Sequence, residues 1–330
     1  MRLLEVRDLH TSFFTDAGEV KAVNGISFNL DRGKVLGIVG ESGSGKSVTA
    51  YSIMQILAGT GKIVSGSIKL DGQELVGSGE KVMKTVRGNK VSIIFQDPMT
   101  SLNPTYTIGH QLMEAILLHT DRNKEQAKER AIEMLRLVNV NEPEKRMNQY
   151  PYEFSGGMRQ RVMIAMALAC EPDILIADEP TTALDVTIQA QILKLMNDLK
   201  SEYNTSIIFI THDLGVIRQI ADTVAVMYCG QVVELTDAET IFHVSEFSHP
   251  YTEGLMISIP RLDTPSNQKL DAIPGAVPHP LKLPKGCKFA PRCKYATEKC
   301  LNEEPPLIKV REGQQVRCFY ARKEDRHATK

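Results

Sequence analysis

A glycine-rich segment near the start of the chain constrains its fold more than any other feature. Residues 40–47 read Gly-Glu-Ser-Gly-Ser-Gly-Lys-Ser and fit the pattern G-x-x-x-x-G-K-[ST]. The apolar run 34–39 before it predicts a buried strand, and residues 48–57 after it carry apolar side chains at helical spacing. Strand, loop and helix in this order are the context in which such a loop wraps a phosphate group. The sequence therefore predicts an α/β domain that binds a nucleotide.

This loop has a well-defined chemistry. Its glycines let backbone N–H groups turn inward around phosphate oxygens, and the following helix presents the positive end of its dipole. We expect Lys46 to reach the β- and γ-phosphates of ATP and the Ser47 hydroxyl to ligate Mg²⁺. The predicted ATP-binding residues of the loop are Gly40, Glu41, Ser42, Gly43, Ser44, Gly45, Lys46, Ser47 and Val48.

A second apolar run, residues 173–177, ends in two carboxylates, Asp178 and Glu179. Two charges at a strand end would ordinarily be read as solvated. Beside a phosphate-binding loop, Asp178 suits coordination of Mg²⁺. Glu179 is placed to polarise a water that attacks the γ-phosphate, as a general base. The pair predicts that the nucleotide is hydrolysed as well as bound.

Composition excludes several classes of protein. Lys+Arg number 39 against Asp+Glu 40, so the net charge of −1 offers no case for nucleic-acid binding. No apolar run approaches the length of a membrane-spanning helix, and the first residues lack a signal-peptide core. We expect a cytosolic chain whose membrane association comes through partners.

The chain reads as three zones followed by a tail. Short strands and turns fill residues 1–95, and residues 97–170 look helical, above all in 108–119 and 124–138. Strands and helices then alternate over 171–235, which predicts a parallel, doubly wound sheet. The apolar strands expected in these zones are 20–23, 65–70, 174–177, 206–210 and 224–227. Prolines cluster beyond residue 260 and predict a linker leading to a small cysteine-bearing tail.

Residues 154–161, Phe-Ser-Gly-Gly-Met-Arg-Gln-Arg, complete a resemblance to the nucleotide-binding subunits of ABC transporters. The segment is similar to the family signature LSGGQ, with Phe154 in place of Leu and Met158 in place of Gln. The resemblance covers roughly residues 1–260. It implies a P-loop ABC ATPase: a RecA-like parallel sheet core, an antiparallel β subdomain and an inserted helical subdomain at about 97–170. A Pro-rich linker and small Cys-containing extension, 261–330, would follow.

The resemblance also implies roles for further residues. Ser155, Gly156 and Gly157 would contact the γ-phosphate of ATP held by an opposite subunit, so a complete site needs two chains head to tail. Gln96 matches the Q-loop, which senses Mg²⁺ and the transmembrane partner, and Asp185 lies in the D-loop. His212 matches the switch histidine, although a lone histidine after a strand is more often structural. The implied catalytic residues are Glu179, His212 and Gln96; the implied Mg²⁺ ligands are Ser47, Gln96 and Asp178.

An aromatic ring near the N-terminus should stack on adenine. Phe13 is the better candidate and Phe14 the alternative, and either ring could instead belong to the core.

Three segments are similar to the dipeptide, oligopeptide and nickel importers in particular: residues 95–104, 249–252 and 273–293. Ser44 and Val48 resemble the D-type subunit, which pairs with a related F-type subunit. The implied function is ATP-driven import of peptides, with nickel or another small solute as the alternative cargo. The implied partners are the second ATPase subunit, two transmembrane permease subunits at the cytoplasmic face of the membrane and, indirectly, an extracytoplasmic peptide-binding protein.

Four of the six cysteines lie together in the tail. Cys287, Cys293, Cys300 and Cys318 are spaced C-x5-C-x6-C-x17-C, and disulfides are not expected in a cytosolic chain. Four thiolates can hold zinc or a [4Fe–4S] cluster, or the thiols can be free. The resemblance favours the cluster, which would staple a short tail with little core of its own. Cys170 and Cys229 read as small buried hydrophobes.

Two other functions fit the same motifs less well. A soluble ABC ATPase acting on DNA or ribosomes would carry a long coiled coil or a second cassette, whereas ordinary helices separate the two glycine-rich segments here. A non-catalytic partner with a degenerate site would lack key residues, yet Lys46, Glu179 and His212 are all present.

Overall fold

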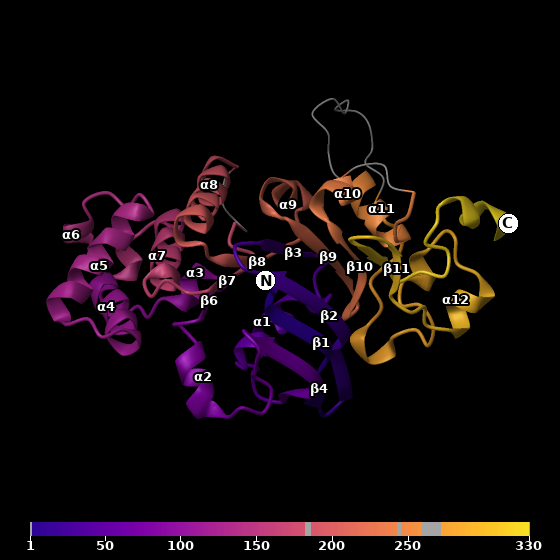
Figure 1. Ribbon diagram of the computed structural model, residues 1–330, viewed down its shortest axis with the longest axis horizontal. Coiled ribbons are helices and arrows are strands. Elements are labelled where there is room, and N and C mark those ends of the chain that lie inside the picture. The colour runs from indigo at the N-terminus through magenta and orange to yellow at the C-terminus, as the bar shows by residue number, and fades with distance from the viewer. Residues whose placement is uncertain (1, 182–185, 243–245, 259–271, 330) are drawn as a thin grey trace. The chain divides into compact units, whose positions relative to one another are not determined.

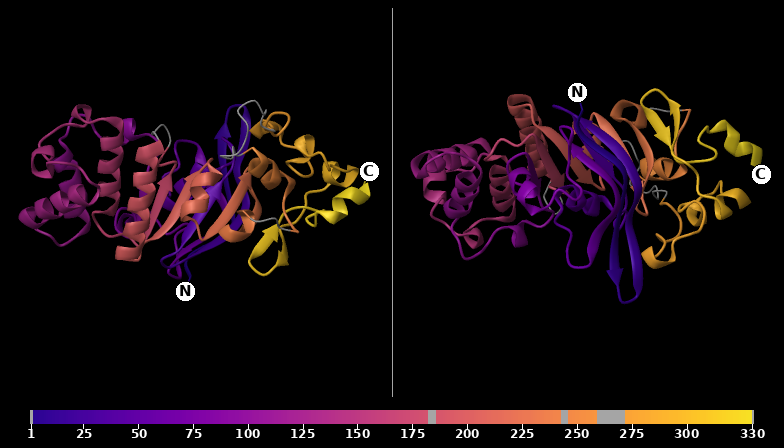
Figure 2. Two further views of the ribbon diagram at one scale, coloured as in Figure 1. Left: turned by 90° about the horizontal axis from the view of Figure 1, so that it is seen from above. Right: turned by 60° about the horizontal axis from the view of Figure 1, so that its bottom comes forward.

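The computed structural model describes residues 2–181, 186–242, 246–258 and 272–329. They form two compact units (Figures 1 and 2). We call residues 2–30, 35–76 and 211–329 the P-loop unit, because the first glycine-rich segment lies in it. We call residues 31–34 and 77–210 the helical unit.

A four-stranded sheet in the P-loop unit is built from the N-terminal residues. Its strands follow the order β2-β1-β4-β5, and β4 runs antiparallel to both β1 and β5. Their bounds are β1 Arg2–Thr15, β2 Gly18–Asp31, β4 Gly61–Leu70 and β5 Gln73–Glu74. Alternate side chains of β1 and β4 are buried, as in the pair Val6 and Ile68, so one face of this sheet packs into the core.

The other strands of the P-loop unit are in the order β11-β12-β10-β9-β3. β3 is parallel to β9, and β10 is antiparallel to both β9 and β12. Their bounds are β3 Val35–Val39, β9 Thr223–Tyr228, β10 Gln231–Asp237, β11 Ile308–Arg311 and β12 Gln314–Val316. Every residue of β3 is buried, as its apolar run predicts. Because β12 pairs with β10, the C-terminal extension adds strands to the sheet that carries the glycine-rich loop.

Helices of the P-loop unit are short. They are α1 Lys46–Met54, α9 Leu214–Ile220, α10 Ala238–Phe242, α11 Pro250–Ile257 and α12 Glu298–Asn302. Three 3₁₀ turns lie in the extension, η2 Pro280–Lys282, η3 Ala290–Arg292 and η4 Glu324–Thr329. No helix among the described residues combines the length and the apolar character that a membrane span requires.

The helical unit contains three parallel strands in the order β8-β7-β6. In the chain, helices lie between β6 and β7 and between β7 and β8. The strands are β6 Val91–Ile94, β7 Ile174–Asp178 and β8 Ser206–Thr211. The helices are α2 Glu80–Val86, α3 Pro98–Ser101, α4 Ile108–His119, α5 Lys124–Leu137, α6 Pro143–Arg146, α7 Gly156–Leu168 and α8 Val186–Tyr203, with a 3₁₀ turn η1 at Pro151–Glu153. α4, α5 and α7 pack together in one helical group (Figure 1).

The predicted helices 108–119 and 124–138 are confirmed, within one residue, as α4 and α5. Asn123 shows why α5 begins where it does: its Oδ1 accepts the Gln126 N–H at 3.0 Å, while Gln126 Oε1 accepts the Asn123 N–H at 3.0 Å. The prediction of short N-terminal strands was wrong in length, because β1 and β2 each span 14 residues. The predicted linker falls largely on 259–271, outside the described residues.

Candidate functional site

The glycine-rich loop connects β3 to α1, as predicted, and steric limits fix its glycines. Gly40 has φ +156° and Gly45 has φ +97°. A Cβ at Gly40 would overlap the carbonyl oxygen of Met227, and one at Gly45 would overlap that of Ala22. Only glycine fits at such close backbone approaches. Gly45 also occupies the N-cap of α1, so the loop delivers the chain directly to a helix N-terminus.

Lys46 lies within the loop and is almost completely buried. Its Nζ donates to the carbonyl oxygens of Gly40, at 2.8 Å, and of Glu41, at 3.1 Å. Ser44 is buried as well, and its carbonyl oxygen accepts the Gly230 N–H at 3.0 Å. The cation expected to bind phosphate is therefore held by oxygen atoms of the loop itself.

Glu41 is tied to the C-terminal extension, which the motif gave no signal to predict. Arg292 Nη1 is 2.6 Å from Glu41 Oε2, and Nη2 is 3.1 Å from Oε1. The Glu41 N–H donates to the Tyr251 hydroxyl at 2.9 Å. Pairing with Glu41 raises the pKa of Arg292, and burial raises the pKa of Tyr251. The loop and the extension thus share one hydrogen-bonded cluster.

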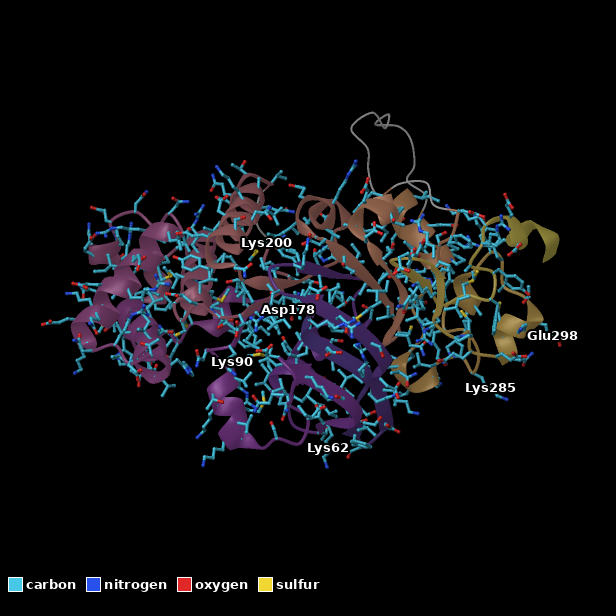
Figure 3. All side chains as sticks on the ribbon, in the orientation of Figure 1. Lys62, Lys90, Asp178, Lys200, Lys285 and Glu298 are labelled. Carbon is cyan, nitrogen blue, oxygen red and sulfur yellow. The ribbon has the colours of Figure 1, made fainter. Side chains whose placement is uncertain are left out.

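In the helical unit, the structure brings Gln96 and Glu179 together. Gln96 Nε2 donates to Glu179 Oε2 at 3.0 Å, across the parallel pair β6 and β7. Glu179 has φ +48°, a conformation that a non-glycine residue adopts rarely, and its N–H donates to the Ile210 carbonyl at 2.9 Å. Asp178, the last residue of β7, is completely buried (Figure 3). Such a backbone outlier beside a buried carboxylate is typical of a functional site.

The second glycine-rich segment begins α7. Ser155 is the N-cap residue, and its Oγ accepts the Met158 N–H at 3.4 Å. Ser155 and Gly156 are exposed, and a Cβ built on Gly156 meets no atom within 4 Å. The helix therefore presents its N-terminus to open space, where backbone N–H groups and the helix dipole favour an anion.

The remaining predicted residues lie at strand ends and loops. His212 follows β8 and is exposed, and the next residue, Asp213, caps α9 by accepting the Gly215 N–H at 2.7 Å. Phe13 is half-buried with its ring against Gly61, whereas Phe14 is 46% exposed. Asp185 falls on 182–185, outside the described residues.

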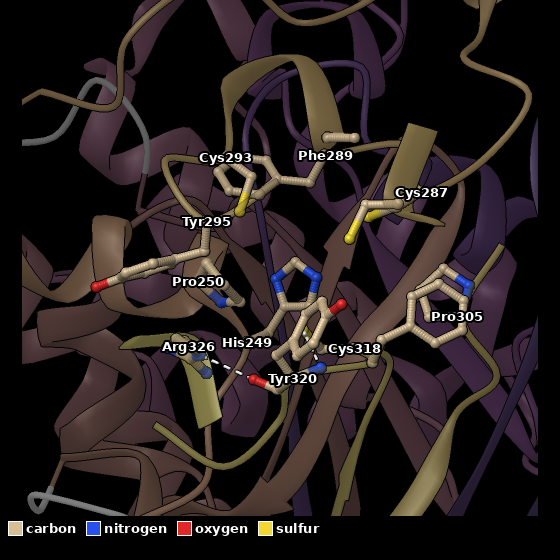
Figure 4. A pocket seen from close by; sticks show the side chains of 13 residues that line it. His249, Pro250, Cys287, Phe289, Cys293, Tyr295, Pro305, Cys318, Tyr320 and Arg326 are labelled. Atoms are coloured by element: carbon tan, nitrogen blue, oxygen red, sulfur yellow. Dashed lines mark hydrogen bonds between the residues drawn. The ribbon is translucent and has the colours of Figure 1, made fainter. Parts of the chain in front are cut away.

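The four tail cysteines line one pocket in the extension (Figure 4). His249, Phe289, Tyr295, Tyr320 and Arg326 are among the other residues that line it. All four cysteines are free, and burial raises the pKa of Cys287, that of Cys293 to about 11 and that of Cys318 to about 12. Among the residues that the structure describes, no group of three or more His, Cys, Asp or Glu is arranged to hold a metal ion. Of the other two cysteines, Cys229 is buried as predicted, and Cys170 is only partly so.

Two protein-family models match the chain. The model described as "ABC transporter" matches residues 23–182, which include both glycine-rich segments, Gln96 and the end of β7. The model described as "Oligopeptide/dipeptide transporter, C-terminal region" matches residues 233–300, which include three of the four tail cysteines.

Curated proteins match over nearly the whole chain. The oligopeptide transport ATP-binding protein AppD of Bacillus subtilis is 53% identical over 96% of this chain and 96% of its own length. The corresponding protein OppD of Escherichia coli is 52% identical over 96% of this chain and 93% of its own length. The dipeptide transport ATP-binding protein DppD of Escherichia coli is 47% identical over 97% of both chains.

Solved structures match the fold. The dimeric structure of a bacterial ABC transporter cassette is 26% identical and has a TM-score of 0.65, covering 72% of this chain and 99% of that one. The dimeric structure of an ATP-binding cassette in a post-hydrolysis state, bound to ADP and Pi, gives the same values. The mixed α/β fold of an ABC ATPase cassette, with parallel and antiparallel sheets, is therefore confirmed for this chain.

Proposed function

This chain belongs to the ABC transporter family, as an ATP-binding subunit of the oligopeptide and dipeptide transporters, and from that premise we propose how its residues use ATP. It is the ATP-binding component that drives oligopeptide or dipeptide import, and its ATPase activity is coupled to transport. It works as part of a membrane transporter complex.

The first half-site is the chain's own nucleotide loop. Residues 40–48 bind the phosphates of ATP, with Lys46 exchanging its carbonyl partners for the β- and γ-phosphates. Phe13 supplies the ring for adenine. The phosphate-binding role of residues 40–48 is supported by the backbone of the loop. At Gly40 and Gly45 there is room for a hydrogen atom but none for a side chain.

Residues at the carboxyl ends of β6, β7 and β8 supply the groups for hydrolysis. Glu179 acts as the general base toward water, and His212 contacts the γ-phosphate. Gln96 and Asp178 would hold Mg²⁺ together with Ser47. Mg²⁺, when bound, offsets the charge of the phosphates. Its ligands would be hard oxygen donors, which fits the chemistry of a carboxylate, an amide and a hydroxyl.

The second half-site is the exposed N-terminus of α7, and it carries the proposal of a shared site. Ser155, Gly156 and Gly157 leave the helix end open, with no side chain covering Gly156. An exposed, capped helix N-terminus is suited to the γ-phosphate of a nucleotide brought by another subunit. Asp185 would lie at the same interface. Binding of ATP closes the pair, and hydrolysis lets it open.

The partners follow from this arrangement. We infer that the second ATPase subunit is a related F-type chain, that two permease subunits form the membrane pathway, and that a peptide-binding protein delivers the cargo outside. This chain then sits at the cytoplasmic face of the membrane. Of the cargoes expected from the sequence, the relatives named for oligopeptide and dipeptide transport support peptides rather than nickel or another small solute. They give no support to a soluble ABC ATPase outside transport.

Ser155→Arg tests the shared site, with Ser201→Arg on the exposed face of α8 as the control. The isolated Ser155 variant should bind ATP as the parent chain does, because its own loop is intact. In the assembled transporter its ATP hydrolysis should fall by about a hundredfold, a loss of the size expected when one phosphate-stabilising group is removed. Weaker ATP binding by the isolated variant, or normal hydrolysis in the assembly, would contradict a shared site.

We propose further that the tail cysteines hold a [4Fe–4S] cluster. Cys287, Cys293, Cys300 and Cys318 line one pocket although up to 31 positions separate them in sequence, and none is in a disulfide. Four cysteine sulfurs are the usual ligands of an iron–sulfur cluster, and binding would have to release the thiol protons that burial retains. Such a cluster would cross-link the extension, and zinc or free thiols are the alternatives. Iron analysis of the purified chain decides among them.

A further inference from the structure

Glu41, the second residue of the nucleotide loop, is held at three of its polar groups. Its carboxylate receives both terminal nitrogens of Arg292, at 2.6 and 3.1 Å. Its N–H donates to the Tyr251 hydroxyl at 2.9 Å, and its carbonyl oxygen accepts from Lys46 Nζ at 3.1 Å. One residue therefore connects the C-terminal third of the chain to the lysine that binds phosphate.

Arg292, like Glu41, is held by several contacts. Its Nε donates to the Pro274 carbonyl at 3.0 Å, and its side chain is only 4% exposed. The guanidinium also lies 5.8 Å from the ring centroid of Tyr228 and 6.0 Å from that of Phe289. A planar guanidinium held at several nitrogens has little freedom, so its position sets the position of the Glu41 carboxylate.

Three aromatic rings pack together beside the Arg292–Glu41 pair, at the end of β9. The Tyr228 ring, at the end of β9, lies 4.7 Å from that of Tyr251 in α11 and 5.3 Å from that of Phe289 in the extension, measured between centroids. Tyr251 and Phe289 are 5.4 Å apart. All three rings are buried. The contact between loop and extension is therefore part of a packed core and is not a surface ion pair of little energetic value.

The charge of Glu41 explains what Arg292 does for the nucleotide. A carboxylate in a phosphate-binding loop repels the phosphates of ATP, and because the Glu41 side chain is 31% exposed, water screens this repulsion only in part. Pairing with a guanidinium cancels that charge and turns the carboxylate to one side. Without Arg292, the carboxylate would be free to pair with Lys46, whose nitrogen already contacts the Glu41 carbonyl.

We propose that Arg292 is a positioning residue of the nucleotide site, through which the C-terminal extension sets the affinity for ATP. Arg292 neutralises Glu41, holds the loop open for phosphate and leaves Lys46 available to it. The proposal depends on the proposed ATP site in residues 40–48. It gives the extension a task in nucleotide binding that does not require the cysteine pocket to be filled.

A double-mutant cycle on the full-length chain tests this proposal. The variants are Arg292→Met, Glu41→Gln and the two combined, and the readout is the dissociation constant for Mg-ATP at low and high salt. We expect Arg292→Met to weaken ATP binding about tenfold at low salt, and less at high salt, because an uncompensated charge is screened. The double variant, which lacks both charges, should recover most of the affinity that Arg292→Met loses, with Glu41→Gln alone as the reference for a loop without its carboxylate.

Arg326→Met is the matched control. Arg326 is 1% exposed, lies in the same extension and pairs with Glu253 at 2.6 Å, but Glu253 is outside the nucleotide loop. Its loss should destabilise the extension, seen as a lower melting temperature, while the folded protein keeps its ATP affinity. Lys46→Ala tests the proposed ATP site in residues 40–48. If this variant binds ATP as the parent does, the ATP site itself is rejected, whatever the Arg292 variants show.

Three results would overturn the role of Arg292. They are unchanged ATP affinity in Arg292→Met, an equal loss of affinity in Arg326→Met, and failure of Glu41→Gln to restore the Arg292→Met variant. If Arg292→Met does not fold, the same comparison is made with Arg292→Gln, which removes the charge and keeps a polar side chain. Its affinity should then lie between that of the parent and that of the Lys46→Ala variant, and an affinity equal to the parent's would overturn the proposal.

Discussion

The side-chain amide of Gln96 donates a hydrogen bond to the carboxylate of Glu179, with 3.0 Å between the two atoms. This hydrogen bond joins the proposed Mg²⁺ ligand to the proposed general base. Both follow neighbouring parallel strands, in which Ile94 pairs with Ala177, so their proximity is a consequence of the sheet. The amide donates through Nε2, whereas Oε1 is the atom that would ligate Mg²⁺, so one side chain can join the proposed metal site to the proposed base.

Glu179→Gln should abolish hydrolysis while preserving ATP binding. The substitution keeps the shape of the side chain and removes the basic oxygen, so turnover should fall by about two to four orders of magnitude. ATP should persist in the assembled transporter and hold the two ATPase subunits together. Phosphate release and the nucleotide retained after gel filtration measure the two effects.

Glu114→Gln, at an exposed position of α4, is the control for the loss of a carboxylate and should hydrolyse ATP normally. Turnover by the Glu179 variant at the parent rate would rule out its role as base.

Substitution of Gly40, whose Cβ position is blocked by neighbouring atoms, should be tolerated far less than substitution of Gly72, where that position is empty. Gly40 and Gly72 both have positive φ, +156° and +80°, but only at Gly40 would a Cβ overlap a backbone oxygen, that of Met227. Gly72→Ala should cost about 1 kcal/mol of unfolding free energy, from backbone strain. Gly40→Ala should cost more and should abolish ATP binding, since the loop has to shift.

Chemical denaturation and ATP titration of the two variants give this comparison. Equal losses of stability with ATP binding intact in both would show that the loop can move away from Met227.

The sequence predicted the local elements well where a motif or a cap fixes them. The loop of residues 40–47 needs glycine for steric reasons, and Asn123 and Gln126 cap α5 within four residues of chain, so both could be read locally. The contact of Arg292 with Glu41 could not, because 251 positions separate the two residues and neither belongs to a pattern that the other completes. The same applies to the strand pairing of β12 with β10. Long-range pairs of this kind depend on packing and leave no periodic signal.

His249 should make the stability of the chain depend on pH. Complete burial, and then the charges of Arg326 and Arg317, lower the pKa of His249 from 6.5 to about 3. The unfolded state therefore binds a proton between these pKa values that the folded state does not, and stability falls as the pH drops below about 6.5. The Glu234 carboxylate accepts the backbone N–H of His249 at 2.8 Å, and burial raises the pKa of Glu234. At low pH the folded state therefore gains a proton on Glu234, which opposes the loss of stability caused by His249.

His249→Asn isolates the histidine contribution, because asparagine does not titrate and also caps a helix well, as His249 Nδ1 does for the Tyr251 N–H. Between pH 7.5 and pH 5.5 the parent should lose about 1.4 kcal/mol more unfolding free energy than the variant. Urea denaturation at the two pH values measures this difference. Identical losses in both chains would mean that His249 takes up its proton in the folded state.

Iron analysis of the purified chain should separate the three alternatives for the cysteine pocket. A chain purified without oxygen should be brown, absorb near about 400 nm and contain about four iron and four sulfide per molecule. Cys293→Ser should lose this colour and iron, since Cys293 lines the pocket, whereas Cys170→Ser in the helical unit should keep both. About one zinc per chain would indicate a tetrahedral site instead, and a colourless chain free of both metals would leave four free thiols.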